Sequence, residues 1–351
     1  MTLSAYEQQA WGQLQERKAA SLSKQAKQIL PQSARDRLAS LGQKAKNAPG
    51  ADKVVAAYGG AAKGLASVVG STASRTVSPK RVVGKYQRAG HDIAELHEIR
   101  GLDLRIVDKV AKHNRLRYGH ALGAAASGLA SGAAVTGGEA LAGAGTIAGM
   151  GAGAAPGIGT VAGAMVGDAA MMLGLAARTV ASTALYHGYD PNDPEEEVFV
   201  MSVIALGMSM GTSAKTAAYA ELSQLTQLLA KSAPWSKLSE KVLTKIAQAF
   251  AAKFAQQLTK AKLGQFVPIA GMAVGSGMNF HIMNQIAVSA RDAYRERFLI
   301  EKSGGDLTGA PDSGETDCVE DEDAIGVITL LRAEDALPPF TQDGFEARPD
   351  N

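Results

Sequence analysis

Hydrophobic residues recur along the chain at helical spacing, and apolar and polar residues almost nowhere alternate with a period of two. Near the N-terminus, for example, Leu3, Tyr6 and Ala10 are three and four positions apart. Turn signals separate such segments, and Ser78 followed by Pro79 indicates one helix start. The pattern therefore predicts an all-α protein, with a multi-helix domain and further helices in front of it.

A long uncharged and glycine-rich block occupies the middle of the chain. Residues 140–167 contain no charged side chain, and Pro156 interrupts them. Glycine recurs every fourth residue on both sides of this proline, at Gly145, Gly149 and Gly153 and then at Gly159, Gly163 and Gly167. In a hairpin folded about Pro156, each arm would present a glycine stripe to the other, so that the two backbones could approach closely. We therefore expect a glycine-zipper hairpin over about residues 120–188.

The sequence leaves open where this hairpin is buried. Each glycine inside a helix costs about 0.8–1 kcal/mol relative to alanine, so tight packing must compensate for it. Arms of about 14 residues are too short to cross a hydrocarbon core of about 30 Å. Three alternatives remain: a full transmembrane hairpin, a hairpin that inserts shallowly or conditionally, and a hairpin buried in a soluble helical domain. Another uncharged stretch, residues 263–290, repeats the small-residue stripe at Gly271 and Gly275.

Charge divides the chain into three parts, although the formal net charge is only +2. Residues 1–118 carry 21 Lys and Arg against 9 Asp and Glu, whereas residues 303–351 carry 2 against 13. We expect a basic helical arm over residues 1–89, a helical domain over residues 90–302 and a disordered acidic tail thereafter. The one apolar run of this tail, residues 325–331, is a candidate docking segment.

Cysteine content and the N-terminus indicate the compartment. The single cysteine, Cys318, excludes an intramolecular disulfide framework and a cysteine-based zinc site. The first residues lack the basic and apolar regions of a secretory signal. We therefore expect a reducing, cytoplasmic location, with the protein bound peripherally to a membrane or partly inserted into it.

Motifs for catalysis or metal binding are weak. Residues 207–211, GMSMG, fit the G-x-S-x-G pattern with Ser209 as nucleophile, but a hydrolase elbow requires a preceding strand. His91, Glu95 and Glu98 would share one helix face that could bind a metal, although such faces are more often only solvated. A P-loop, a dinucleotide-binding loop and a nucleic-acid-binding module are missing from the sequence. We therefore expect a non-enzymatic protein without cofactor, metal or nucleic-acid partner.

The loop before one predicted helix has its own signature. Asp193 is placed to cap that helix and Pro194 to occupy its first position, with glutamates at residues 195–197 facing the helix dipole. Together with Tyr189 and Asp190, these residues belong to a longer phrase that also occurs in a known protein family.

Three segments carry this resemblance, namely residues 102–122, residues 168–206 and residues 267–299. They resemble the EcsC family of bacterial proteins over roughly residues 90–302. Tyr189 and Asp190 are similar to the end of a Tyr-Gly-Tyr-Asp pattern, into which this chain inserts a histidine. The resemblance implies an all-helical domain linked to membrane or export processes, because the family is named after a neighbour of an ABC transporter gene, and it implies no catalytic residue.

These observations lead to two expectations of function. In the first, the glycine-ridged hairpin and the basic helices engage a bilayer containing anionic lipid, or a membrane protein, and the glycine ridges also allow self-association. In the alternative, the protein is a soluble scaffold or adaptor, and its acidic tail folds back on the basic N-terminal segment and masks it.

Overall fold

The protein is described by a computed structural model that covers residues 3–23, 78–112, 158–209, 211–231, 233–263, 271–304, 307 and 325–338. These residues form helices and no strand, in agreement with the all-α prediction.

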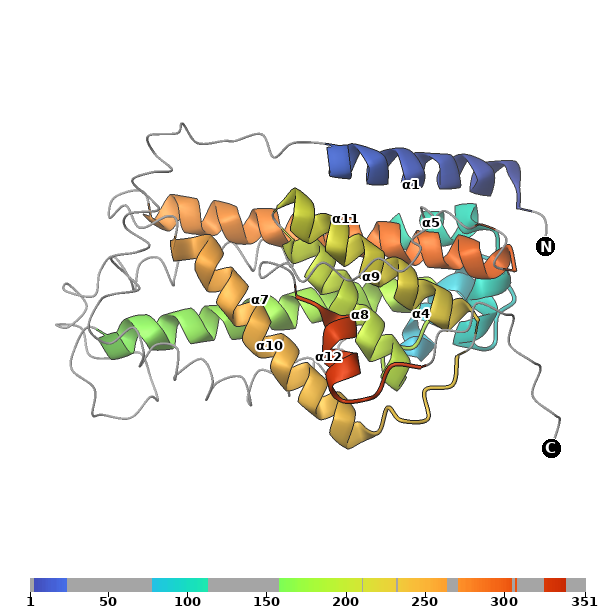
Figure 1. Ribbon diagram of the computed structural model, residues 1–351. Coiled ribbons are helices and arrows are strands. Elements are labelled where there is room, and N and C mark those ends of the chain that lie inside the picture. The colour runs from blue at the N-terminus through green and yellow to red at the C-terminus, as the bar shows by residue number, and fades with distance from the viewer. Residues whose placement is uncertain are drawn as a thin grey trace.

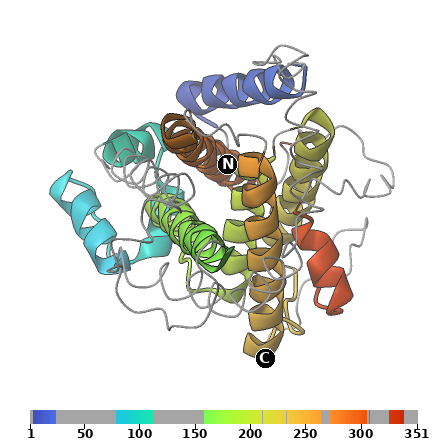
Figure 2. The same cartoon turned by 90° about the vertical axis from the view of Figure 1, so that its left-hand side faces the viewer.

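The main bundle consists of α7 (Ile158–Tyr186), α8 (Pro194–Met208), α9 (Thr212–Ala230), α10 (Glu240–Leu263) and α11 (Gly271–Lys302). α7 and α11 run side by side in the same direction, and α10 crosses α7 (Figures 1 and 2). α8 lies between these helices and contacts all of them as well as α9. This arrangement places α8 at the centre of the bundle.

Further helices cover the bundle on the outside. They are α1 (Ala5–Ser23), α4 (Pro79–Arg88), the 3-10 helix η1 (Leu96–Gly101), α5 (Leu104–Lys112) and α12 (Val327–Ala333). α4, η1 and α5 gather at one end of the bundle, and α12 lies against α10 (Figure 1).

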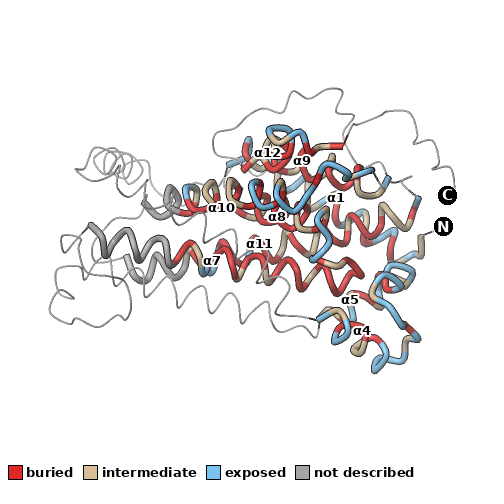
Figure 3. Tube along the Cα trace, turned by 90° about the horizontal axis from the view of Figure 1, so that it is seen from below, coloured by how far each residue is buried: buried red, intermediate tan, exposed pale blue. Residues whose placement is uncertain are grey.

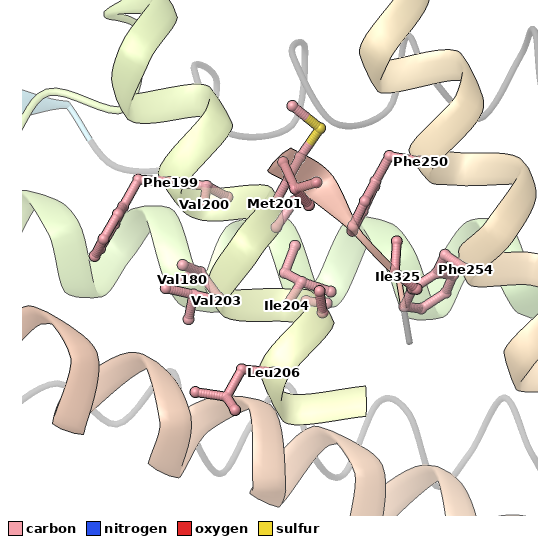
Figure 4. Packing of buried hydrophobic residues seen from close by; sticks show 14 of the residues in the cluster. Val180, Phe199, Val200, Met201, Val203, Ile204, Leu206, Phe250, Phe254 and Ile325 are labelled. Carbon is pink, nitrogen blue, oxygen red and sulfur yellow. The ribbon is translucent and has the colours of Figure 1, made fainter. Parts of the chain in front are cut away.

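The apolar sequence of α8 explains its central position. Residues 198–206 contain no charged side chain, and a helix that is apolar all round must be buried. Phe199, Val203 and Ile204 are fully buried in a core to which α7, α10 and α11 also contribute (burial is coloured in Figure 3). Figure 4 shows Val180 of α7 and Phe250 and Phe254 of α10 near α8. A Cβ atom added at Gly207 would lie 2.6 Å from the Cα atom of Ile286, so α8 and α11 approach closely only because this residue is glycine.

The helix α1 is joined to the bundle by apolar contacts and by ion pairs. Ala10 and Leu14 are buried, and Tyr6 and Trp11 pack, partly buried, against the same cluster. Ion pairs join it to α11: Arg17 with Asp292 at 3.1 Å, Lys18 with Glu296 at 3.2 Å and Glu7 with Lys302 at 2.6 Å. Basic residues of the predicted N-terminal arm are therefore already paired with acidic residues of the bundle.

The predicted disorder of the acidic tail is wrong for residues 325–338. The apolar run that we considered a docking segment forms α12 and the turn before it, and α12 contacts α8, α9 and α10. Ile325, Val327 and Leu331 are buried there, which provides the apolar contacts that order this segment. This described part of the tail thus packs on the bundle, against α8, α9 and α10.

Candidate functional site

The predicted glycine hairpin is only partly described. Gly145, Gly149 and Gly153 lie outside the described residues. The second set is helical: Gly159, Gly163 and Gly167 are in α7, and Gly271 and Gly275 are in the first turns of α11. The contacts around these five glycines also lie outside the description, so the pairing of the ridges stays a prediction.

The apolar segments of the chain nevertheless meet at one place. α7 and α11 both begin, and α10 ends, at the left-hand end of the bundle in Figure 1. We call the region formed by residues 158–167 of α7 and residues 271–278 of α11 the apolar end, and the last turn of α10 lies beside it. Neither of the two segments from α7 and α11 contains a charged residue.

A buried polar contact marks where the apolar end stops. Asn279 Nδ2 donates a hydrogen bond to Asp168 Oδ1 at 3.0 Å, and both side chains are buried. Asp168 directly follows the uncharged segment of α7, whereas Asn279 lies within the uncharged stretch of α11, which continues to residue 290. The bond therefore fixes the register of the two helices, so that their uncharged segments project together beyond it.

Large apolar side chains are exposed close to this boundary. Met171 of α7 is 50% exposed and Phe280 of α11 is 42% exposed. Helix α7 also contains a stretch, Asp168–Tyr186, that is long and apolar enough to span a membrane, with a mean hydropathy of 1.2. However, 72% of this stretch is buried inside the bundle, as in the core helix of a soluble protein.

A cluster of buried charges occupies the opposite end of the bundle. Arg297 of α11 donates to Glu196 Oε2 of α8 at 2.6 Å and, through Nε, to Glu301 Oε1 at 2.8 Å. Tyr294 donates to the second oxygen of Glu196 at 2.6 Å, and the Arg297 guanidinium lies 4.0 Å from the ring centroid of Tyr189. Burial lowers the pKa of Arg297, but Glu196 and Tyr189 outweigh it and raise the pKa, so the side chain stays charged.

Four residues of this cluster, Tyr189, Glu196, Arg297 and Glu301, line a cleft of about 630 Å³. Arg100 of η1 lies at one side, with its Nη1 atom 3.6 Å from Glu301 Oε2, and Trp235 lies at another. Asp190, Asp193 and Glu195 also line the cleft. Serine, threonine, cysteine and lysine are missing from the described residues that line it, so it offers binding groups rather than a side-chain nucleophile of these types.

The loop with the family motif forms one wall of the cleft. Gly188 has a φ of +87°, and a Cβ atom there would lie 3.0 Å from Arg100 Cγ and from the Leu96 carbonyl oxygen. Asp190 Oδ1 accepts a hydrogen bond from the backbone N–H of Asn192 at 3.0 Å, which closes a turn. Glycine is therefore required where this loop passes η1.

The predicted cap of α8 is confirmed in position but not in detail. Asp193 is the N-cap residue and Pro194 the first helical residue, yet the Asp193 side chain makes no capping hydrogen bond. Burial, together with the nearby Asp190 and Glu195 carboxylates, raises the pKa of Asp193. Of the three glutamates that we assigned to the helix dipole, Glu196 is instead buried against Arg297.

The inserted histidine of the loop is part of the core. His187 is 2% exposed, its Nδ1 atom lies 2.8 Å from the Thr183 carbonyl oxygen, and its ring stacks on Tyr294. Its Nε2 atom has no hydrogen-bond partner. Burial lowers the pKa of His187 to about 4, so the imidazole is neutral at physiological pH.

The two motifs considered for catalysis and metal binding take other local structures. Ser209 ends α8, and its hydroxyl donates to the Ala205 carbonyl oxygen at 3.0 Å. His91 precedes η1, and Glu95 and Glu98 form the capping box of that 3-10 helix, so the three residues do not share one helix face as expected. In the described parts of the chain, no group of three or more His, Cys, Asp and Glu residues could hold a metal ion.

The helical bundle and its cleft can be compared with known proteins. The model of the EcsC protein family matches residues 7–299, most of the chain. The chain belongs to the EcsC family. The match begins well before residue 90, where the sequence alone placed the start of the resemblance, and it includes α1 and α4.

A curated relative is similar over part of the chain. The relative is "Uncharacterized protein YdbA" of Bacillus subtilis, which is 25% identical to this chain over 140 residues. The aligned region covers 39% of this chain and 48% of YdbA. The chain thus matches about half the length of this relative. No protein of known structure matches the chain.

Sequence reasoning missed the residues that organise the cleft of this EcsC-family protein. Arg297 and Glu301 stand in the charged run that ends α11. Their spacing of four residues puts them on one helix face, and this was the available signal. Their partner Glu196 lies about 100 positions earlier, so the pairing itself could not be read locally.

Proposed function

We propose that this EcsC-family protein is a non-enzymatic, membrane-associated helical protein on the cytoplasmic side of a bilayer, and that its apolar end enters one leaflet. The observation that carries the proposal is the common position of the uncharged starts of α7 and α11, next to the exposed Met171 and Phe280. Exposed apolar surface on helices that project together is typical of a membrane-contacting site.

The length of the uncharged segments favours shallow insertion. Residues 158–167 extend over about 15 Å at 1.5 Å per residue, which is half of a hydrocarbon core of about 30 Å. Asp168 is then the first charged residue of α7. Burying a carboxylate deeper in hydrocarbon is costly, so this residue would limit the depth of insertion.

Basic residues near the apolar end would meet lipid headgroups. The last turn of α10 contains Lys260 and Lys262, and α10 ends at the apolar end. The basic helix α4 lies at the other end of the bundle, so the proposal assigns the headgroup contact to α10 and no longer to this helix. Cations at the membrane surface favour anionic lipid. The family's link to an ABC transporter gene extends the proposal to export processes.

Liposome flotation tests the proposal. We expect the wild-type protein to float with vesicles rich in phosphatidylglycerol at low salt and to float less with phosphatidylcholine vesicles. Because Met171 and Phe280 are exposed, changing each to aspartate should leave the fold intact and reduce the floating fraction severalfold. Gln13→Asp, at an exposed position of α1, is the matched control and should float like wild type. A wild-type protein that stays at the bottom of the gradient refutes the lipid partner.

The glycine ridges are tested separately. If the stripes of the two predicted hairpin arms face each other, Gly149→Leu and Gly163→Leu should each lower the thermal stability or change the floating fraction, because leucine would force the backbones apart. Two variants that behave like wild type in both measurements would contradict the facing-ridge arrangement and the self-association that depends on it.

A further inference from the structure

The helix α12 packs on a surface formed by α8, α9 and α10, which we call its seat. Its apolar residues Val327, Ile328 and Leu331 are fully buried against α8, α9 and α10. Ile325, just before the helix, packs in the same cluster as Phe250 and Phe254 of α10 (Figure 4). The seat is therefore a groove with an aromatic floor.

A carboxylate from another helix caps the beginning of α12. Glu221 of α9 is 9% exposed, and its Oε2 atom accepts a hydrogen bond from the Val327 backbone N–H at 3.0 Å. A Cβ atom at Gly326 would lie 2.9 Å from Thr329 Oγ1 and 3.1 Å from Glu221 Oε1. The groove thus accepts a helix whose first residue follows a glycine and whose amides point at Glu221.

Lysines of the groove bind the acidic residues that follow α12. Lys245 of α10 lies 2.7 Å from the Glu334 carboxylate, and Lys237, before α10, lies 2.7 Å from that of Asp335. The groove is therefore apolar in the middle, accepts amide hydrogen bonds at one end and is positively charged at the other.

We propose that this groove is a helix-binding site and that α12 is its displaceable occupant within the chain. A helix of seven residues is unstable in water by itself, so α12 is folded by its seat rather than by its own sequence. It follows α11 only after residues 303–326, and so docks as a separate segment. The chemistry of the occupant defines the partner: an apolar protein helix that begins after a glycine and is followed by acidic residues.

The test uses the full-length chain and a fluorescein-labelled peptide of residues 325–338. Ile328→Asp combined with Leu331→Asp places charges on the buried face of α12 and should eject it from the groove. We expect the peptide to bind this open variant at least tenfold more tightly than it binds wild type, where α12 competes. A peptide with the same two substitutions is the control and should not bind either protein.

A charge exchange tests the register of the bound helix. Lys245→Glu in the open variant should weaken binding of the normal peptide several-fold, and a peptide with Glu334→Lys should recover it. These results do not depend on the membrane proposal, because no lipid is present.

Three outcomes would overturn the inference. The open variant could keep its helix content and still fail to bind the peptide. It could lose its cooperative thermal transition, in which case α12 is an integral part of the core. Finally, phosphatidylglycerol vesicles, rather than the peptide, could bind the open variant more tightly than wild type, which would make the groove a lipid-binding surface.

Discussion

Arg297 and Glu196 form a buried ion pair between α11 and α8, in which Nη1 lies 2.6 Å from Oε2 and the two side chains are 7% and 3% exposed. Replacing Arg297 with leucine would leave Glu196 and Glu301 buried without their cation. We expect this change to lower the free energy of unfolding by about 3–5 kcal/mol, as measured by urea denaturation. Arg17→Leu removes an ion pair whose arginine is 40% exposed and should cost less than about 1 kcal/mol. Similar losses for the two variants would contradict the importance of the buried pair.

Comparing Gly188 of the family-motif loop with Gly90, which follows α4, separates the effect of backbone strain from that of steric crowding. Gly188 and Gly90 have φ values of +87° and +89°, but only Gly188 has neighbouring atoms where a Cβ atom would stand. Alanine at either position should cost about 1–2 kcal/mol for the left-handed conformation. Gly188→Ala should cost a further 1–3 kcal/mol or so, because it pushes the loop away from η1. Equal urea midpoints would show that the contact with η1 does not require glycine.

The close approach of α8 and α11 gives a second pair of variants. Gly207→Ala places a methyl group 2.6 Å from the Ile286 backbone and should destabilise the protein by about 1–3 kcal/mol. Gly84→Ala, inside α4 and without atoms within 4 Å, should instead stabilise it by about 0.5–1 kcal/mol. The two substitutions should therefore shift the melting temperature in opposite directions, as measured by differential scanning calorimetry. A stabilising Gly207→Ala would mean that the helices can separate freely.

The docking of α12 should depend on pH through Glu221. Burial raises the pKa of this carboxyl from 4.5 to about 7, against its backbone hydrogen bonds to Val327 and Ile328 and the charges of Lys253 on α10 and Arg332 on α12. The neutral form is therefore favoured when α12 is docked. Protonation of Glu221 therefore stabilises the docked helix fully below pH 4.5, and this stabilisation is lost as the pH rises to 7. Over this range the equilibrium constant for docking of α12 falls by at most about tenfold per pH unit.

Hydrogen exchange of the Val327 and Ile328 amides measures this effect, after correction for the intrinsic rates. Protection in wild type should fall between pH 5 and pH 7 and then level off. Glu221→Gln keeps a neutral side chain in place and should remove most of the slope. If the variant shows the same slope as wild type, another group controls docking.

Local signals predicted the parts of the fold that depend on neighbouring residues. Pro79 and Pro194 begin α4 and α8 as expected, because proline lacks the N–H that the first helical turn leaves unpaired. The uncharged run of α8 predicted an apolar helix, and its burial follows from the same composition. The apolar run of the tail was likewise visible before its docking was known.

Pairings between distant segments decided the rest. Nothing near Glu196 distinguishes it from Glu195 and Glu197, and it is buried because Arg297 reaches it from another helix. In the same way, the apolar run of residues 325–331 predicted that this segment docks on the protein but not where it docks. Its position depends on Glu221 of α9, which binds its first helical amide. His91, Glu95 and Glu98 had the spacing of a helix face, but Glu95 and Glu98 instead form the capping box of a 3-10 helix, and His91 lies before it.

The helix α11 has 32 residues and is therefore a rod about 48 Å long. One end of it belongs to the apolar end, and the other carries Arg297 and Glu301, which line the cleft. A stiff rod transmits a shift along its axis with little loss. We therefore expect a displacement of the Phe280 end of α11 to move Arg297 and Glu301 at the cleft. Conversely, a ligand that holds the cleft residues in place should restrict movement of the Phe280 end.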